Sequence, residues 1–231
     1  MVVPNVYQHL VGERTMSLHR FIVLALALFC WLGAAHAEEA APQPHIEYPA
    51  SSEFVVLELT GTGTLITDTE QRPFVRIHGD GRVHVRRPSY VRLDPGDFEA
   101  YLSHSDLRSL LSLCASKGLM EFDRQAVEDE HEAEARDRLQ TTGSVPGVAD
   151  AGYTILQIQL AEYAPAGSEV VTEGVQKRIS WRALSDVVSW YPGIEALARF
   201  QEFVDVLESI QDATIEASKR DEISIFLPPV P

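Results

Sequence analysis

Five basic side chains alternate along two short runs on either side of a Gly-Asp-Gly sequence. They are Arg76, His78, Arg82, His84 and Arg86, together called the basic stripe. Guanidinium groups bind carboxylates and phosphates, and histidines with a reference pKa of about 6.5 would make such binding pH-dependent. Alternatively, the basic stripe is the solvated face of a hairpin, neutralised by the acidic segment from Glu128 to Glu134. The sequence leaves both interpretations open.

The spacing of apolar residues predicts how this hairpin pairs. If Gly79-Asp80-Gly81 forms a three-residue loop with its last glycine left-handed, Ile77 lies opposite Val83 and Val75 lies opposite Val85. All four apolar side chains then share one face. A two-residue Asp-Gly turn would break this match. We therefore predict the three-residue loop, which directs the basic stripe to the other face.

Sequence patterns for metal binding and catalysis are weaker than the basic stripe. The candidate metal ligands are His78 with His84, or Glu128 with His131 and Glu132. The pair lacks a third ligand, and the triplet lacks a His-Glu-x-x-His pattern. The sequence also lacks a Gly-x-Ser-x-Gly elbow and a Ser-x-x-Lys motif. We therefore predict no metal, no cofactor and no catalytic motif, although scattered residues could still converge in the fold.

Three aromatic residues, Trp181, Trp190 and Tyr191, cluster in the second half of the chain. Such residues either line a groove that anchors a partner or pack in the core, and core packing is the more frequent role.

Cys114 lies at helical spacing from several leucines, which predicts a buried small apolar side chain.

The first 37 residues have the order of a secretory signal. Arg20 precedes an apolar run from Phe21 to Leu32, and Ala35-His36-Ala37 supplies a small-residue cleavage site. The run is shorter than the ~20 residues that a membrane-spanning helix needs. We therefore predict cleavage after Ala37, giving an exported protein, periplasmic or secreted, with no stable membrane insertion after cleavage.

The protein is acidic, with a formal net charge of −15. Removal of residues 1–37 takes away two arginines and one glutamate, so the remaining sequence carries −16. Such a surface repels nucleic acid and anionic lipid. We therefore expect no nucleic-acid partner, and a protein or small anionic molecule as the partner of the basic stripe.

Hydrophobic periodicity predicts a single α+β domain over residues 54–231. Alternation indicates strands over 54–60, beside the Gly-Asp-Gly loop, and within 153–160 and 170–181, the last two forming a hairpin. Spacings of three and four predict one amphipathic helix from Ser103 to Gly118 and another from Pro192 to Ile210. This order predicts an antiparallel sheet with amphipathic helices packed on one side.

Four segments are harder to assign. Residues 38–53 are rich in Ala, Pro and Ser and predict a flexible lead-in. Residues 90–102 supply another strand or an irregular crossing. Residues 124–147 form a charged excursion that is either a solvated helix or a mobile segment. The proline-rich run 223–231 lies along a sheet edge or in an extended groove.

Three segments resemble a family of uncharacterised exported bacterial proteins. They are the Gly-Asp-Gly hairpin of Val75 to Val83, the capped Leu-rich helix ending at Gly118-Leu119, and Val148-Ala-Asp-Ala-Gly-Tyr-Thr154. The resemblance implies a shared fold and an exported location, and it implies no activity or site residues.

These observations favour a non-enzymatic exported interaction module that binds an acidic or anionic partner through the basic stripe. The alternative is an extracytoplasmic hydrolase whose catalytic residues are scattered through the sequence.

Overall fold

The computed structural model describes residues 42–62, 73–88 and 95–227, which belong to one compact unit beginning at Pro42. The predicted signal peptide, residues 90–94 and the last four residues lie outside the described residues. In sequence order the elements are β1 (His45–Glu47), β2 (Val55–Gly61), β3 (Val75–His78), β4 (Arg82–Arg87), β5 (Gly96–Leu102), α2 (His104–Ser116), α3 (Arg124–Thr142), β6 (Tyr153–Ala164), β7 (Thr172–Arg182), α4 (Leu184–Trp190), α5 (Glu195–Lys219) and β8 (Ser224–Ile225).

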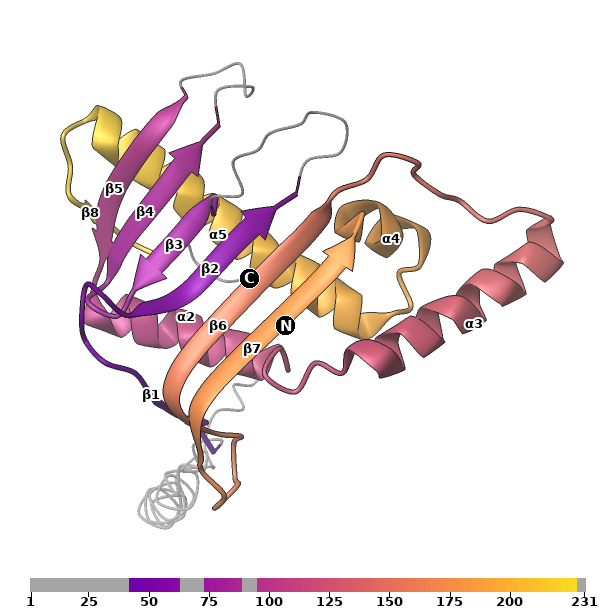
Figure 1. The fold of residues 1–231 in the computed structure, drawn as a ribbon, viewed down its shortest axis with the longest axis horizontal. Coiled ribbons are helices and arrows are strands. Elements are labelled where there is room, and N and C mark those ends of the chain that lie inside the picture. The colour runs from indigo at the N-terminus through magenta and orange to yellow at the C-terminus, as the bar shows by residue number, and fades with distance from the viewer. Residues whose placement is uncertain (1–41, 63–72, 89–94, 228–231) are drawn as a thin grey trace, which may run out of the picture. The chain divides into compact units, whose positions relative to one another are not determined.

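The strands form one mixed, mostly antiparallel sheet (Figure 1). The long strand β6 pairs with β7, and it also pairs with β2 near its start and with β1 near its end. From β2 the sheet continues through β3, β4 and β5 to β8, which runs parallel to β5. The C-terminal run therefore reaches a sheet edge, one of the two predicted alternatives.

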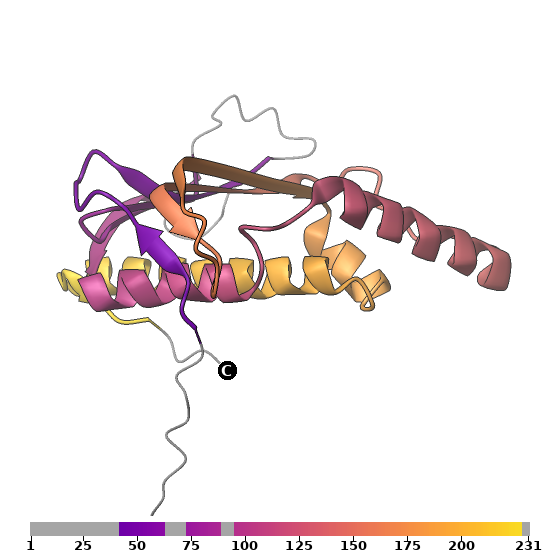
Figure 2. The ribbon, with the colours of Figure 1, turned by 90° about the horizontal axis from the view of Figure 1, so that it is seen from below.

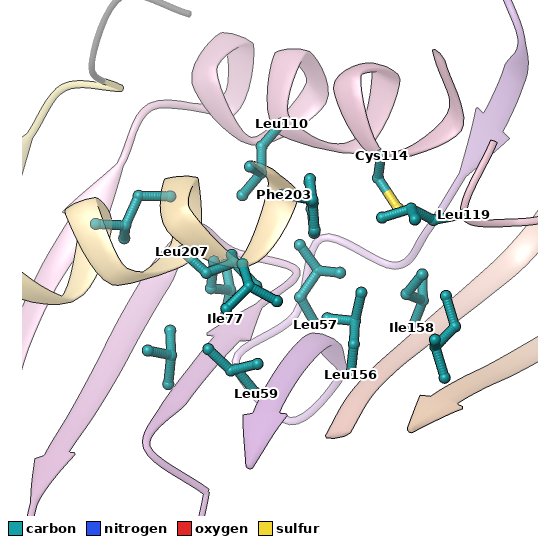
Figure 3. Close-up of a cluster of buried hydrophobic side chains, with 14 of the residues drawn as sticks. Leu57, Leu59, Ile77, Leu110, Cys114, Leu119, Leu156, Ile158, Phe203 and Leu207 are labelled. Carbon is teal, nitrogen blue, oxygen red and sulfur yellow. The ribbon is translucent and has the colours of Figure 1, made fainter. Parts of the chain in front are cut away.

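Helices α2 and α5 cover one face of the sheet (Figure 2). Apolar side chains from the strands meet those of the helices in a continuous core (Figure 3). The strands contribute Leu57, Leu59, Ile77, Leu156 and Ile158, and the helices contribute Leu110, Cys114, Phe203 and Leu207. Burial of each large apolar side chain contributes about 1.5–3 kcal/mol. The predicted α+β class, with amphipathic helices on one side of an antiparallel sheet, is confirmed.

The Gly-Asp-Gly hairpin has the predicted register. Ile77 pairs with Val83 and Val75 with Val85 across β3 and β4. Gly81 has a φ of 89°, and a Cβ there would lie 2.4 Å from the backbone oxygen of Leu102. The loop therefore requires glycine both for its left-handed backbone and for the close approach of β5.

Helix α2 begins and ends as predicted. The Ser103 hydroxyl accepts a hydrogen bond of 3.1 Å from the backbone N–H of Asp106. Gly118, just after the helix, has a left-handed φ of 70°. Cys114 is 1 % exposed, which confirms its predicted burial.

The predicted flexible lead-in is wrong for residues 42–53, because β1 lies within it. Ile46 and Tyr48 are buried, and β1 pairs with the end of β6. A Cβ on Gly79 would lie 1.9 Å from the backbone oxygen of Pro49, so the segment after β1 crosses directly against the hairpin loop. Ile46 within β1 and Tyr48 just after it are two residues apart and so point to the same side of the chain, toward the core.

The charged excursion contains the 19-residue helix α3, the helical alternative of the two considered. Asp123 caps it by accepting from the backbone N–H groups of Gln125 and Ala126, and Gly143 ends it in a left-handed conformation. Val127 is its one buried side chain among the described residues. The helix runs outward past the edge of the sheet (Figure 2). In the part of the protein that is described, no helix is long and apolar enough to cross a membrane.

Candidate functional site

The basic stripe finds its carboxylate partners within the sheet. The Arg76 guanidinium contacts the Glu58 carboxylate of β2, with Nε and Oε2 separated by 3.1 Å. Arg82 donates to the backbone oxygen of Ser52 at 3.1 Å and lies 3.9 Å from the Glu99 carboxylate of β5. The expectation that the Glu128 to Glu134 segment would neutralise this face is therefore corrected, since neighbouring strands supply the acids.

The other members of the stripe are less available than the sequence suggested. His84 lies 3.6 Å from the Asp97 carboxylate. His78 and Arg86 are only 8 % and 7 % exposed. Burial lowers the pKa of His78, and the neighbouring Arg82 guanidinium lowers it further. The anion-binding role of the stripe stays a prediction, but ion pairs and burial reduce the charge that it presents.

A different feature has the form of a ligand site. A cavity of about 420 Å³ opens between α3, the start of β6, the end of β7, the loop 145–148 and α4. We call it the aromatic cavity. Its lining combines aromatic rings with arginine, glutamate and apolar side chains. Small-molecule sites commonly have this size and mixture.

Three rings interlock in the wall of the aromatic cavity. His131 of α3 lies edge-to-face with Trp181, at 5.8 Å between centroids and 88° between planes, and with Tyr191, at 4.9 Å and 90°. Arg138 lies over the Tyr191 ring at 5.7 Å and donates to the backbone oxygen of Trp190 at 2.8 Å. Trp181 and Tyr191 are buried, as the core-packing alternative predicts, and all three aromatic residues line the cavity, while the anchoring of a partner stays a prediction.

The turn between β7 and α4 positions Trp181 and the residues of α4 around the aromatic cavity. Trp181 ends a row of inward-facing β7 side chains, and the backbone then passes through Ala183 at φ 51° and ψ 42°. This left-handed conformation is costly for a residue with a Cβ. The Ala183 N–H donates to the backbone oxygen of Gly152 at 2.9 Å, which fixes the turn against the start of β6.

The two carboxylates of the aromatic cavity are already paired with arginines of α3. Arg124 donates through Nε to Glu128 at 2.7 Å and through Nη1 to the Ser180 hydroxyl at 3.1 Å. Arg136 donates to Glu132 at 3.4 Å. These charges therefore largely cancel within the helix.

Arg182 is differently placed. Its guanidinium donates to the backbone oxygens of Ala151, Ala149 and Val148, at 3.2, 2.6 and 3.4 Å. Within the described residues it contacts no carboxylate. It therefore holds the loop at the rim of the aromatic cavity while keeping its positive charge.

The hydroxyl of Tyr191 has no hydrogen-bond partner among the described residues, although it is buried. The whole residue is only 4 % exposed and lines the aromatic cavity. Leaving a buried polar group unsatisfied costs about 1–3 kcal/mol. Such exceptions are few in folded proteins and are typical of functional positions.

Ser180 and His131 are the cavity-lining residues from which a hydrolase could draw a nucleophile and a base. The Ser180 hydroxyl accepts a hydrogen bond of 3.1 Å from the Arg124 guanidinium, and His131 packs edge-to-face against Tyr191. Burial raises the pKa of the Cys114 thiol, so that the reactive thiolate is disfavoured. Among the described residues, no group of three or more His, Cys, Asp or Glu is placed to hold a metal ion.

Comparison of the sequence and structure with protein-family models, curated proteins and solved structures gave no match. The site is therefore defined by its own geometry. Sequence reasoning identified Trp181, Trp190 and Tyr191, but it missed His131 as their partner and Arg182 as the rim cation. No sequence pattern signalled Arg182, since consecutive strand residues face opposite sides and Trp181 and Arg182 would be expected on different faces.

Proposed function

We propose that this protein is a non-enzymatic binding module that works after export, and that the aromatic cavity is its ligand site. The observation that carries the proposal is a cavity of about 420 Å³ that aromatic residues line together with Arg182, a cation bonded only to backbone oxygens among the described residues. A ligand in the cavity would cover the aromatic rings and lie beside the Arg182 guanidinium, whose partners among the described residues are all uncharged.

The ion pairs of the basic stripe support this choice over the face that the sequence favoured. Arg76 and His84 already have carboxylates within reach, so an anion binding there would have to compete with Glu58 and Asp97. Exposed pairs are individually weak, at about 0–1 kcal/mol, but they remove the unbalanced charge that would attract a partner.

Tryptophan fluorescence provides a direct test. The protein has three tryptophans, and two of them, Trp181 and Trp190, line the aromatic cavity. In the full-length protein with Trp31→Phe, all tryptophan emission comes from these two. Titration with p-cresol, a neutral aromatic probe, should give a saturable change in emission.

A matched pair of variants locates the binding. Val148 lines the aromatic cavity and is 37 % exposed, whereas Val170 at the tip of the β6–β7 hairpin is 74 % exposed. Val148→Phe should narrow the cavity and weaken the p-cresol response, while Val170→Phe should leave it unchanged. A response that never saturates, or that is equal in both variants, would contradict the proposed site.

Export is a separate part of the proposal, supported by the signal-like first 37 residues. Intact-mass measurement and N-terminal sequencing of the protein from a bacterial periplasm or culture medium should give a polypeptide that starts at Glu38. Recovery of the uncut protein in the cytoplasm would contradict it.

A further inference from the structure

Hydrogen-bond donors are in excess around the aromatic cavity. The lining residues Trp181, Trp190 and Arg182 all carry N–H donors, and Arg182 uses only neutral backbone acceptors in the described part of the protein. Acceptors are scarcer, because Glu128 and Glu132 already bond to arginines. A complementary ligand therefore carries oxygen acceptors.

The charges of the lining residues indicate that the ligand carries one negative charge. Arg182 is the cavity-lining cation whose partners among the described residues are all uncharged. A guanidinium pairs well with a carboxylate, which matches its fork geometry. Arg124, the other arginine that lines the cavity, already bonds to Glu128, so the second charge of a phosphate would find no further cation without a carboxylate partner among the described lining residues.

The remaining lining requires an apolar body on the ligand. Aromatic rings form one wall, and Val145, Val148 and Val187 contribute apolar surface. Val145 and Val148 are 44 % and 37 % exposed, which is high for valine. They leave apolar surface at the rim of the cavity that a ligand can cover.

We propose that the aromatic cavity binds a carboxylate joined to an apolar or aromatic group, with Arg182 as the partner of the carboxylate. This inference rests on the proposed function and specifies its ligand class. Two sources share this chemistry: a free aromatic acid, and the C-terminal residue of a peptide or protein.

Calorimetric titration of the full-length protein with two matched probes tests the charge. N-acetyl-L-phenylalanine carries the carboxylate, and N-acetyl-L-phenylalanine amide has the same shape without the charge. We expect the acid to bind about tenfold more tightly, as one charge-assisted contact would give. Equal affinity of the two probes would overturn the inference.

Variants on one strand assign the contact to Arg182. Arg182→Gln should reduce the preference for the acid over the amide to about one. Arg178→Gln makes the same change of charge four residues earlier on β7, about 13 Å away at ~3.3 Å per residue, and should keep the preference. Retention of the preference in Arg182→Gln would overturn the role of Arg182. Because Arg182 also holds the rim loop, Arg182→Lys is included and should keep part of the preference through its charge alone.

Two further probes distinguish the sources. Tighter binding of 3-phenylpropionate than of an acetylated tetrapeptide ending in a free Phe carboxylate supports the inference with a free acid as ligand. The reverse order supports it with the carboxyl terminus of a peptide or protein as ligand. If p-cresol saturates the cavity but the acid and amide do not differ, this inference fails while the proposed function stands. If none of the probes binds saturably, both fail.

Discussion

The imidazole ring of His131 stands edge-on to the phenol ring of Tyr191, with 4.9 Å between the centroids and 90° between the planes. This contact joins the middle of α3 to the end of α4. Because Val127 is the one buried side chain of α3 among the described residues, the rings of the aromatic cavity carry much of its docking. The ligand site and the attachment of α3 are thus built from the same residues.

Replacement of His131 by Ala should therefore loosen α3. Each edge-to-face pair is worth about 0.5–1.5 kcal/mol, so losing the contacts with Trp181 and Tyr191 should lower the free energy of unfolding by about 1–3 kcal/mol. Hydrogen exchange measured by mass spectrometry should accelerate across Arg124–Thr142 and remain slow in α5. His131→Phe keeps a ring and should restore most of the protection. Unchanged exchange in α3 would show that its other contacts suffice.

The strained turn at Ala183 gives a second prediction. A left-handed conformation costs about 1–2 kcal/mol for a residue with a Cβ, and glycine avoids this cost but loses about 0.4–1 kcal/mol through the freedom of the unfolded state. Ala183→Gly should therefore be neutral or stabilising by up to about 1.6 kcal/mol in urea denaturation.

A β-branched residue provides the matched comparison at this position. Ala183→Val should destabilise the protein by more than about 1 kcal/mol, because its branched Cβ tolerates the left-handed region least. If valine were tolerated as well as glycine, the turn would not be strained as described.

Local patterns in the sequence were sufficient for much of the fold. The register of the Gly-Asp-Gly hairpin followed from apolar spacing, and Ser103 and Gly118 marked the ends of α2 because caps act within one turn. Strand β1 was missed because Ile46 is its one strong apolar residue, and its partner β6 lies more than a hundred residues away. Helix α4 was missed because its start at Ala183 has no side-chain cap.

The candidate site was only partly predictable for the same reason. Trp181, Trp190 and Tyr191 are close in sequence and were recognised together as aromatic anchors. His131 joins them through the packing of α3 against β7 and α4, which no local pattern encodes. The stripe residues were placed on the correct face, but their partners Glu58 and Asp97 come from strands whose order the sequence did not reveal.

The buried His78 predicts a pH dependence of stability. Its pKa is lowered in the folded state, first by burial and then by Arg82, so the unfolded state binds a proton more readily. The contribution of His78 to the free energy of unfolding is therefore present above its unfolded pKa of about 6.5 and is lost as the pH falls through the lower folded value. Urea denaturation between pH 7.5 and 5 should show this decline, and His78→Asn should flatten it.

Arg82 offers an independent check on the same histidine. Arg82→Gln removes the neighbouring positive charge, so the titration midpoint of His78, followed by NMR, should rise toward 6.5 without reaching it, because burial remains. A midpoint above 6.5 in the unmodified protein would contradict the direction assigned here.

The thiol of Cys114 reports on the core between α2 and the sheet. It is 1 % exposed, and burial raises its pKa, so both access and ionisation oppose reaction with a disulfide reagent. In the full-length protein with Cys30→Ser, the native state at pH 8 should remain unlabelled by Ellman's reagent, and one thiol should react in guanidinium chloride. Cys114→Ser should destabilise more than Cys114→Ala, because an unsatisfied buried hydroxyl adds about 1–3 kcal/mol. Rapid labelling of the native protein, or equal stability of the two variants, would place Cys114 in a looser environment than the packed interface of Leu57, Leu110 and Leu119.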